Sequence, residues 1–241
     1  ATLASGSLDA NLAVRRTDNK PGELALKAAY SNETKALDLD FKADEPAGGV
    51  MAGLLNLPGR PSVSLTLKGA GPLNDFAADL TLATDGANRL TGHTTVARDG
   101  EGYRLGSTLS GDLAALVQPD YALYLAGHST LDLSARIDDA GPISLDKLTL
   151  SAPVLTLQGS AALAADYFPT AIDIDGRLAG QNGALPLGGA NATTRLGEGR
   201  LRFSFGHGGA WSLELAANGL STPTLDAESL AISGHGAATD L

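Results

Sequence analysis

The segment Gly59–Leu82, GRPSVSLTLKGAGPLNDFAADLTL, contains the pattern that decides the fold. It begins with glycine, continues into alternating apolar and polar residues, turns at Gly71-Pro72 and enters a second alternating stretch. The segment Gly127–Leu150, GHSTLDLSARIDDAGPISLDKLTL, has the same layout, with its turn at Gly141-Pro142. Strict alternation is typical of strands with one apolar and one wet face. The repeat therefore predicts β-hairpins in an elongated, stacked architecture.

The same alternation extends over most of the chain, from Leu8 to Leu215. Antiparallel sheets joined by tight turns have this character, and we expect about fourteen strands in a meander. We predict an all-β fold in which residues 1–241 form one elongated, curled antiparallel sheet, with degenerate repeat units at about 48–110 and 112–180. Turn residues separate the strands at Asp18-Asn19, Pro21-Gly22, Asp85-Gly86, Asp99-Gly100, Asp139–Pro142 and Gly208-Gly209.

Residues 48–57, GGVMAGLLNL, interrupt the alternation and predict a short helix that ends before Pro58. The helix is too short and too apolar to stand alone, so it should lie on the apolar face of the sheet. The side chains that we expect to face the sheet are Val50, Met51, Leu54 and Leu57.

Residues 112–126, DLAALVQPDYALYLA, predict a second short helical segment. Asp112 can act as its N-cap, Pro119 interrupts it and Gly127 can close it. We expect Leu113, Leu116 and Val117 to share one face, and Leu113 and Leu116 to contact the apolar side of the sheet.

The composition narrows the possible functions. The chain has 43% apolar but only 5% aromatic residues, 30 glycines and a formal net charge of −10. Because nucleic acid binding needs a basic footprint, we expect no nucleic acid partner. The absence of cysteine excludes disulfides, thiolate metal sites and a thiol nucleophile. The sequence has no run of about 18 apolar residues that could span a membrane.

No catalytic motif is recognisable. The histidines, His93, His128, His207 and His235, are far apart and mostly lie beside glycine, which is not metal-ligand spacing. Gly127-His128-Ser129 begins like a nucleophile elbow, but Leu131 occupies the position of the closing glycine. We therefore predict a non-enzymatic protein without a metal or cofactor.

The apolar face is the candidate functional surface. A closed barrel or a flattened sandwich would make it an ordinary packed core, whereas an incompletely curled sheet would leave an apolar trough. A trough lined by Leu, Val and Ile suits acyl chains. The residues that we predict to line it are Leu39, Val63, Leu65, Leu67, Leu80, Leu82, Leu131, Leu133, Ile137, Leu148, Leu150, Leu155, Leu157, Ile172, Ile174, Leu201, Phe203, Leu213 and Leu215.

Parts of the sequence resemble the TamB family, the translocation and assembly module subunit of the wider AsmA-like group. The resemblance is carried by GELALKAAY (Gly22–Tyr30), the stretch Asp44–Gly49, and the segment Leu54–Gly86. Its most specific part is LPGRP (Leu57–Pro61), followed by GxGPL (Gly69–Leu73). Over the first 110 residues or so the resemblance is strong, and beyond them it is compositional.

The resemblance implies a β-taco, a folded sheet with an apolar concave groove, within a protein that an N-terminal helix anchors in the inner membrane. It implies a periplasmic location, phospholipid transport between the inner and outer membranes, and outer-membrane protein assembly with an Omp85-type barrel. On this basis the chain would be a fragment from the C-terminal half, and we expect a monomer that contacts phospholipid acyl chains.

Three functions remain open at this point. The first is a lipid conduit, which requires an open apolar face. The second is a chaperone that offers a sheet edge or groove to the strands of an unfolded barrel or autotransporter. The third is a purely structural β-repeat domain with a packed core.

Overall fold

A computed structural model describes residues 2–4, 6–16, 21–180, 184–189 and 192–238. The protein has an all-β fold with a 17-stranded sheet, and every strand pairing in the described residues is antiparallel. The prediction of the fold class is confirmed. Three strands are very short, namely β1 (Thr2–Ala4), β13 (Leu185–Pro186) and β14 (Arg195–Leu196). The fourteen long strands are β2 (Ser7–Arg15), β3 (Glu23–Ser31), β4 (Ala36–Glu45), β5 (Val63–Pro72), β6 (Asp75–Thr84), β7 (Ala87–Arg98), β8 (Gly102–Gly111), β9 (Ser129–Asp138), β10 (Ile143–Ser151), β11 (Leu155–Leu163), β12 (Pro169–Ala179), β15 (Glu198–Phe205), β16 (Ala210–Ser221) and β17 (Asp226–Ala237).

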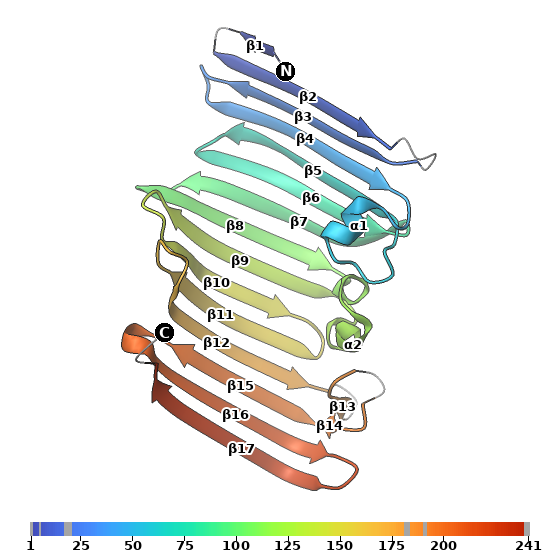
Figure 1. The fold of residues 1–241 in the computed structure, drawn as a ribbon, viewed down its shortest axis with the longest axis vertical. Coiled ribbons are helices and arrows are strands. Elements are labelled where there is room, and N and C mark those ends of the chain that lie inside the picture. The colour runs from blue at the N-terminus through green and yellow to red at the C-terminus, as the bar shows by residue number, and fades with distance from the viewer. Residues whose placement is uncertain (1, 5, 17–20, 181–183, 190–191, 239–241) are drawn as a thin grey trace.

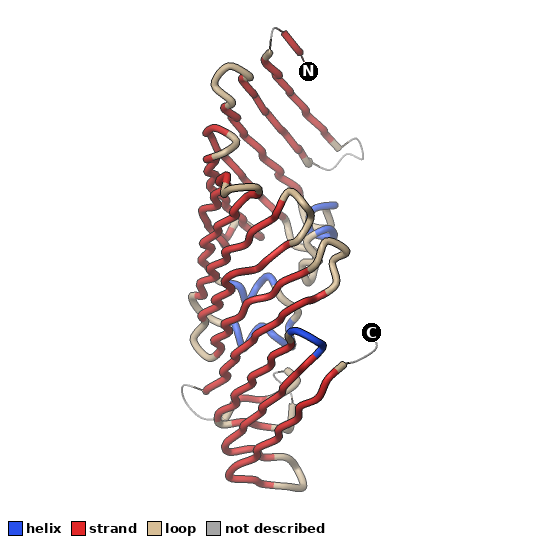
Figure 2. The backbone as a smooth tube through the Cα atoms, turned by 90° about the vertical axis from the view of Figure 1, so that its left-hand side faces the viewer, coloured by secondary structure: helices blue, strands red, loops and turns tan. Residues whose placement is uncertain are grey.

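The long strands form a meander in which each strand pairs with the next in sequence (Figure 1). The meander is interrupted where β12 pairs directly with β15, while β13 and β14 form a small hairpin from which Arg195 of β14 also pairs with Ser221 of β16. The sheet stays open rather than closing into a barrel. Figure 2 shows the bent sheet from the side.

The repeated sequence units form corresponding hairpins, β5–β6 and β9–β10. A β-bulge between Leu145 and Lys147 adds a residue to β10. As a result Leu145 and Leu148 face the same side, although their spacing contradicts simple alternation. The turn at Asp85-Gly86 has positive φ at both residues, 51° and 76°, as a two-residue hairpin turn requires. The predicted turn at Asp18-Asn19 lies outside the described residues.

Helix α1 (Val50–Leu54) lies where the sequence predicts a helix, but it turns a different face to the sheet. Val50 and Leu54 are 64% and 74% exposed, so the expectation that they face the sheet is wrong. The helix has only five residues, and its buried side is formed by Ala52. Beyond the helix, the amide of Leu57 donates a hydrogen bond to the Ala52 carbonyl oxygen, which brings the Leu57 side chain back onto the sheet.

The second helical segment is divided into three pieces: the 3₁₀ turn η1 (Leu113–Leu116), helix α2 (Pro119–Ala122) and the 3₁₀ turn η2 (Leu123–Leu125). The carboxylate of Asp112 caps η1 by accepting a hydrogen bond of 3.2 Å from the amide of Ala114, as predicted. Pro119 separates the pieces by starting α2, because a proline fits the first turn of a helix. Among the described residues, no helix is both long and apolar enough to cross a bilayer.

Three insertions interrupt the meander at regular intervals, and all lie at the same end of the strands (Figure 1). The first insertion, α1, follows β4, the second, η1–α2–η2, follows β8, and the third, β13–β14, follows β12. The repeat that the sequence predicts therefore corresponds to a unit of four strands and one insertion.

Candidate functional site: an open apolar groove

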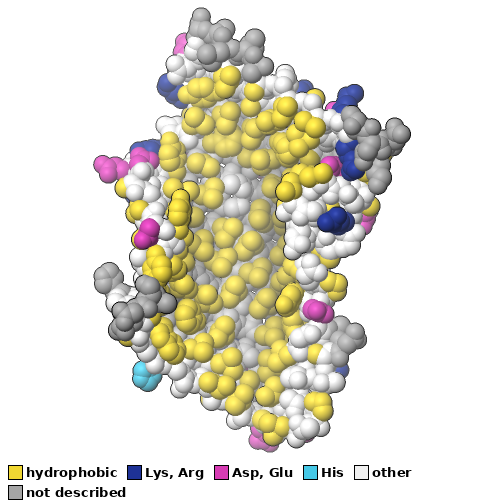
Figure 3. Space-filling model, viewed as in Figure 1, with side chains coloured by type: hydrophobic (Ala, Val, Ile, Leu, Met, Phe, Trp, Pro, Cys, Tyr) yellow, Lys and Arg dark blue, Asp and Glu magenta, His cyan; other side chains and the backbone are white. Residues whose placement is uncertain are grey.

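The strand register aligns apolar residues into continuous rows. In the central row, each residue is the direct cross-strand partner of the next, so that all side chains of the row share one face of the sheet. The row spans all fourteen long strands and contains Leu12, Leu26, Phe41, Leu67, Leu80, Gly92, Leu109, Leu131, Leu150, Leu157, Gly176, Leu201, Leu215 and Ile232. We call the hollowed face that carries this row the apolar groove; Figure 3 shows it covered by hydrophobic side chains, with charged groups near its margins.

All the residues predicted to line a trough lie on this face, because each belongs to the central row or stands an even number of residues from it on the same strand. Val63 and Leu82 are buried, since α1 covers them. Ile137 and Leu201 are 46% and 37% exposed. The others are half-buried. The face is therefore not a packed core, in which such side chains would be shielded from water.

The only buried cluster of substantial hydrophobic side chains found in the described chain lies beneath the first insertion. It contains Ala52, Leu57, Val63 and Leu82, and Met51, Leu65 and Leu116 pack against it. Sequence reasoning assigned Leu82 to the groove surface without recognising that α1 shields it. The groove also contains leucines of β7 and β8 that the predicted set omits, Leu90, Leu105 and Leu109, because threonine and glycine weaken the alternation there.

Polar side chains interrupt the groove at a few places. Thr94 and Ser107 are cross-strand partners whose hydroxyl oxygens lie 3.0 Å apart. Thr84 is buried, and its hydroxyl oxygen accepts a hydrogen bond of 3.1 Å from Nε of Arg89. Ser129 is fully buried, and its Oγ has no hydrogen-bond partner within the described structure. The groove is therefore apolar over most of its length, but it has polar points in β6–β9, two of them, Thr84 and Ser129, at strand ends beside the insertions.

The three insertions contact one another and build one rim of the groove. Leu116 of the second insertion packs against the cluster beneath α1. The Tyr124 hydroxyl donates a hydrogen bond of 2.7 Å to the carbonyl oxygen of Pro186 in the third insertion, and accepts one of 3.2 Å from the amide of Gly188. Because these contacts link consecutive insertions, the three insertions form a continuous rim along the groove rather than separate protrusions.

The opposite face of the sheet is polar and carries cross-strand ion pairs. Lys68 Nζ lies 3.3 Å from Asp40 Oδ2, and His93 Nδ1 lies 2.7 Å from Asp79 Oδ1. Hydrogen bonds from the guanidinium groups of Arg202 and Arg200 lower the pKa of the Asp175 carboxyl. These ion-paired side chains are solvent-exposed, so each pair adds little to the stability of the protein. Their main effect is to make this face of the sheet hydrophilic.

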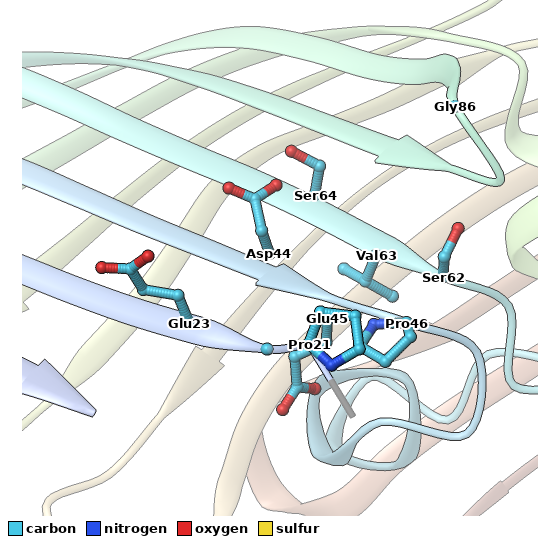
Figure 4. Close-up of a pocket in the computed structure, with 10 residues that line it drawn as sticks. Pro21, Glu23, Asp44, Glu45, Pro46, Ser62, Val63, Ser64 and Gly86 are labelled. Carbon is cyan, nitrogen blue, oxygen red and sulfur yellow. The ribbon is translucent and has the colours of Figure 1, made fainter. Parts of the chain in front are cut away.

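Apart from the groove, a pocket of about 410 Å³ lies at the ends of β3–β6, outside the central row (Figure 4). Glu23, Asp44 and Ser64 contribute polar groups to it. Glu45 turns toward α1, where its carboxylate accepts a hydrogen bond of 2.7 Å from the amide of Met51. Among the residues that the structure describes, no group of three or more histidine or acidic side chains could hold a metal ion.

The groove can therefore sequester apolar material over a long path, since its rows contain few hydrogen-bonding groups and, apart from the parts beneath the insertions, its face is not covered by the rest of the described chain. Comparisons with protein-family models, with characterised proteins and with solved structures find no match to this chain.

Proposed function

We propose that this chain is the groove-forming segment of a TamB-like protein of the periplasm. The groove would carry phospholipid acyl chains between the inner and outer membranes and take part in outer-membrane protein assembly with an Omp85-type barrel. The observation that carries the proposal is the central row, an apolar path across fourteen strands whose side chains are mostly only half-buried. The sequence resemblance supports the location and the barrel partner.

Acyl chains fit this surface better than polar ligands do. Lys27, Lys42, Lys68, Arg104 and Arg136 all lie on the opposite face by register, so they cannot converge on a headgroup over the groove. Binding should then arise from burial of methylene groups, at about 0.8 kcal/mol each. We expect affinity to rise with acyl length and to differ little between phosphatidylethanolamine and phosphatidylglycerol.

Site-specific photocrosslinking tests the proposal. A photoreactive amino acid at Leu150 or Leu157 should crosslink phospholipid in cells, while one at the neighbouring outward residues Thr149 and Gln158 should not. Leu39 and Phe203 extend the test along the groove. Equal crosslinking from both faces, or none from the groove, would contradict the proposal. Extraction of phospholipid from the purified chain provides an independent check.

An edge-strand scaffold for barrel or autotransporter assembly is the second candidate. In the described chain β17 pairs with β16 alone, over eleven cross-strand residue pairs, so its other edge presents unpaired backbone groups. A disulfide crosslink between a cysteine placed in β17 and one in a barrel strand would support this function. Unchanged barrel assembly after a proline is placed at Ser229 would argue against it.

A further inference from the structure

A pocket of about 420 Å³ lies within the part of the groove built by β11–β17. Its floor is formed by two adjacent rows of residues from β11, β12, β15, β16 and β17. Leu187 and Leu196 of the third insertion complete the lining. The groove is thus partly enclosed here by the third insertion.

The hollow exists because three neighbouring strands contribute small residues to its floor, Gly176, Gly199 and Ala217. Leu196, which is only 6% exposed, lies over Gly199, where an added Cβ would come within 2.7 Å of its Cδ2 atom. Gly176 has no such cover. The nearest atom to a Cβ added there would be Leu157 Cδ1, at 3.4 Å. Although Gly176 is buried between its larger neighbours, an added Cβ would find room there, so the space above it is part of the pocket.

The pocket offers a ligand almost no polar partner. The two charged residues of its lining use their guanidinium groups on the opposite face, where Arg177 donates to Glu198 at 2.7 Å and Arg200 to Asp175 at 3.0 Å. The floor strands β12, β15 and β16 are paired on both sides, so their backbone groups are engaged in the sheet. A peptide backbone bound here would lose hydrogen bonds to water without replacement, which disfavours a peptide.

We propose that this pocket is a discrete binding site within the groove for the methyl end of a single fatty acyl chain. The inference rests on the proposed lipid function and adds to it a preferred site, where the third insertion partly encloses the groove. The volume of this pocket is in the range of pockets that bind small molecules. A hydrocarbon tail has no hydrogen-bond donor or acceptor, so it loses nothing in a lining that offers none. The polar end of the ligand stays outside the pocket.

The test uses palmitic acid with a photoreactive diazirine at its methyl end, and peptide mapping of the adducts by mass spectrometry. In the unaltered chain, saturable adducts should concentrate on Leu187, Leu196 and the floor strands. Gly176→Val fills the space without requiring a positive φ, and should weaken saturable binding about tenfold, or about 1.4 kcal/mol. The control Ala171→Val adds the same kind of side chain to β12 on the opposite, solvent-exposed face and should leave binding unchanged.

Leu187→Gln provides a second variant, because Leu187 is half-buried in an insertion and its replacement leaves the meander intact. It should reduce adduct formation at the pocket as well. Adducts spread evenly along the groove, or unchanged binding in both pocket variants, would overturn the proposal of a discrete acyl-chain site. The proposed lipid-binding function of the groove would still stand. Absence of adducts from the whole groove would overturn the proposed function itself. Displacement of the probe by an apolar peptide, but not by unlabelled palmitic acid, would show a peptide site instead.

Discussion

The Tyr124 hydroxyl donates a 2.7 Å hydrogen bond to the Pro186 carbonyl oxygen, across sixty-two positions of the sequence. The bond joins the second insertion to the third, and the amide of Gly188 donates to the same hydroxyl. A single side chain therefore connects two neighbouring repeat units at the rim of the groove.

Tyr124→Phe should loosen the rim without unfolding the sheet. Loss of the hydroxyl removes two hydrogen bonds, each worth about 1 kcal/mol. We expect faster amide hydrogen exchange at Gly188 and unchanged exchange in β5 and β6. Tyr121→Phe is the matched control, because Tyr121 is exposed and its hydroxyl makes no hydrogen bond in the described structure. Equal exchange in both variants would show that the bond does not hold the rim.

The same substitution should have different effects beneath α1 and in the open groove. Leu82→Asp buries a carboxylate in the cluster with Val63, and should destabilise the protein by about 3 kcal/mol or more. Leu133→Asp and Ile137→Asp leave the carboxylate in contact with water, so the sheet should stay folded while acyl-chain crosslinking falls. Circular dichroism and lipid crosslinking distinguish these effects. Unfolding at all these sites would indicate a packed interior.

Trp211 should report on acyl chains in the groove by its fluorescence. It is the one tryptophan of the chain, and its ring lies over Gly234 and Gly236 of β17. Fatty acid brominated along its chain should quench this fluorescence in a saturable manner. Dissolved bromide ion serves as the control for simple solvent access. Quenching by bromide but not by the brominated chain would place Trp211 outside the lipid path.

Asp175 should make stability depend on pH under acidic conditions. Its pKa in the folded protein lies below the unfolded value of about 3.9, because Arg202 and Arg200 stabilise the carboxylate. Its contribution to stability is therefore present above that unfolded value, and is lost as the pH falls through the folded pKa. Chemical denaturation at several acidic pH values should show a shallower loss of stability for Asp175→Asn.

Asp173→Asn is the matched control for this effect. Asp173 lies on the same strand, is exposed and accepts no side-chain hydrogen bond in the described structure. The control should keep the pH dependence of the unaltered chain. Identical curves for both variants would show that the arginine pairs at Asp175 are too well screened by solvent to matter.

Over most of the chain, the sequence by itself determined which residues form strands and which side of the sheet they face; the exceptions are β7 and β8, where threonine and glycine weaken the alternation, and the bulge in β10. Alternation is a local property with a period of two, so Leu133 and its partner Leu148 could be assigned to the same face without knowledge of their pairing. Asp112 likewise could be identified as a cap, because capping involves only the next few residues.

Only the tertiary structure decided that the sheet stays open, that Ala52 and not Val50 faces it, and that Tyr124 reaches Pro186. Openness depends on twist and curl accumulated over all strands, which no single alternating segment encodes. The pocket above Gly176 likewise arises only after its floor strands and the third insertion, which are distant in sequence, have been brought together. Local periodicity fixes the faces of strands, whereas enclosure is a property of long-range packing.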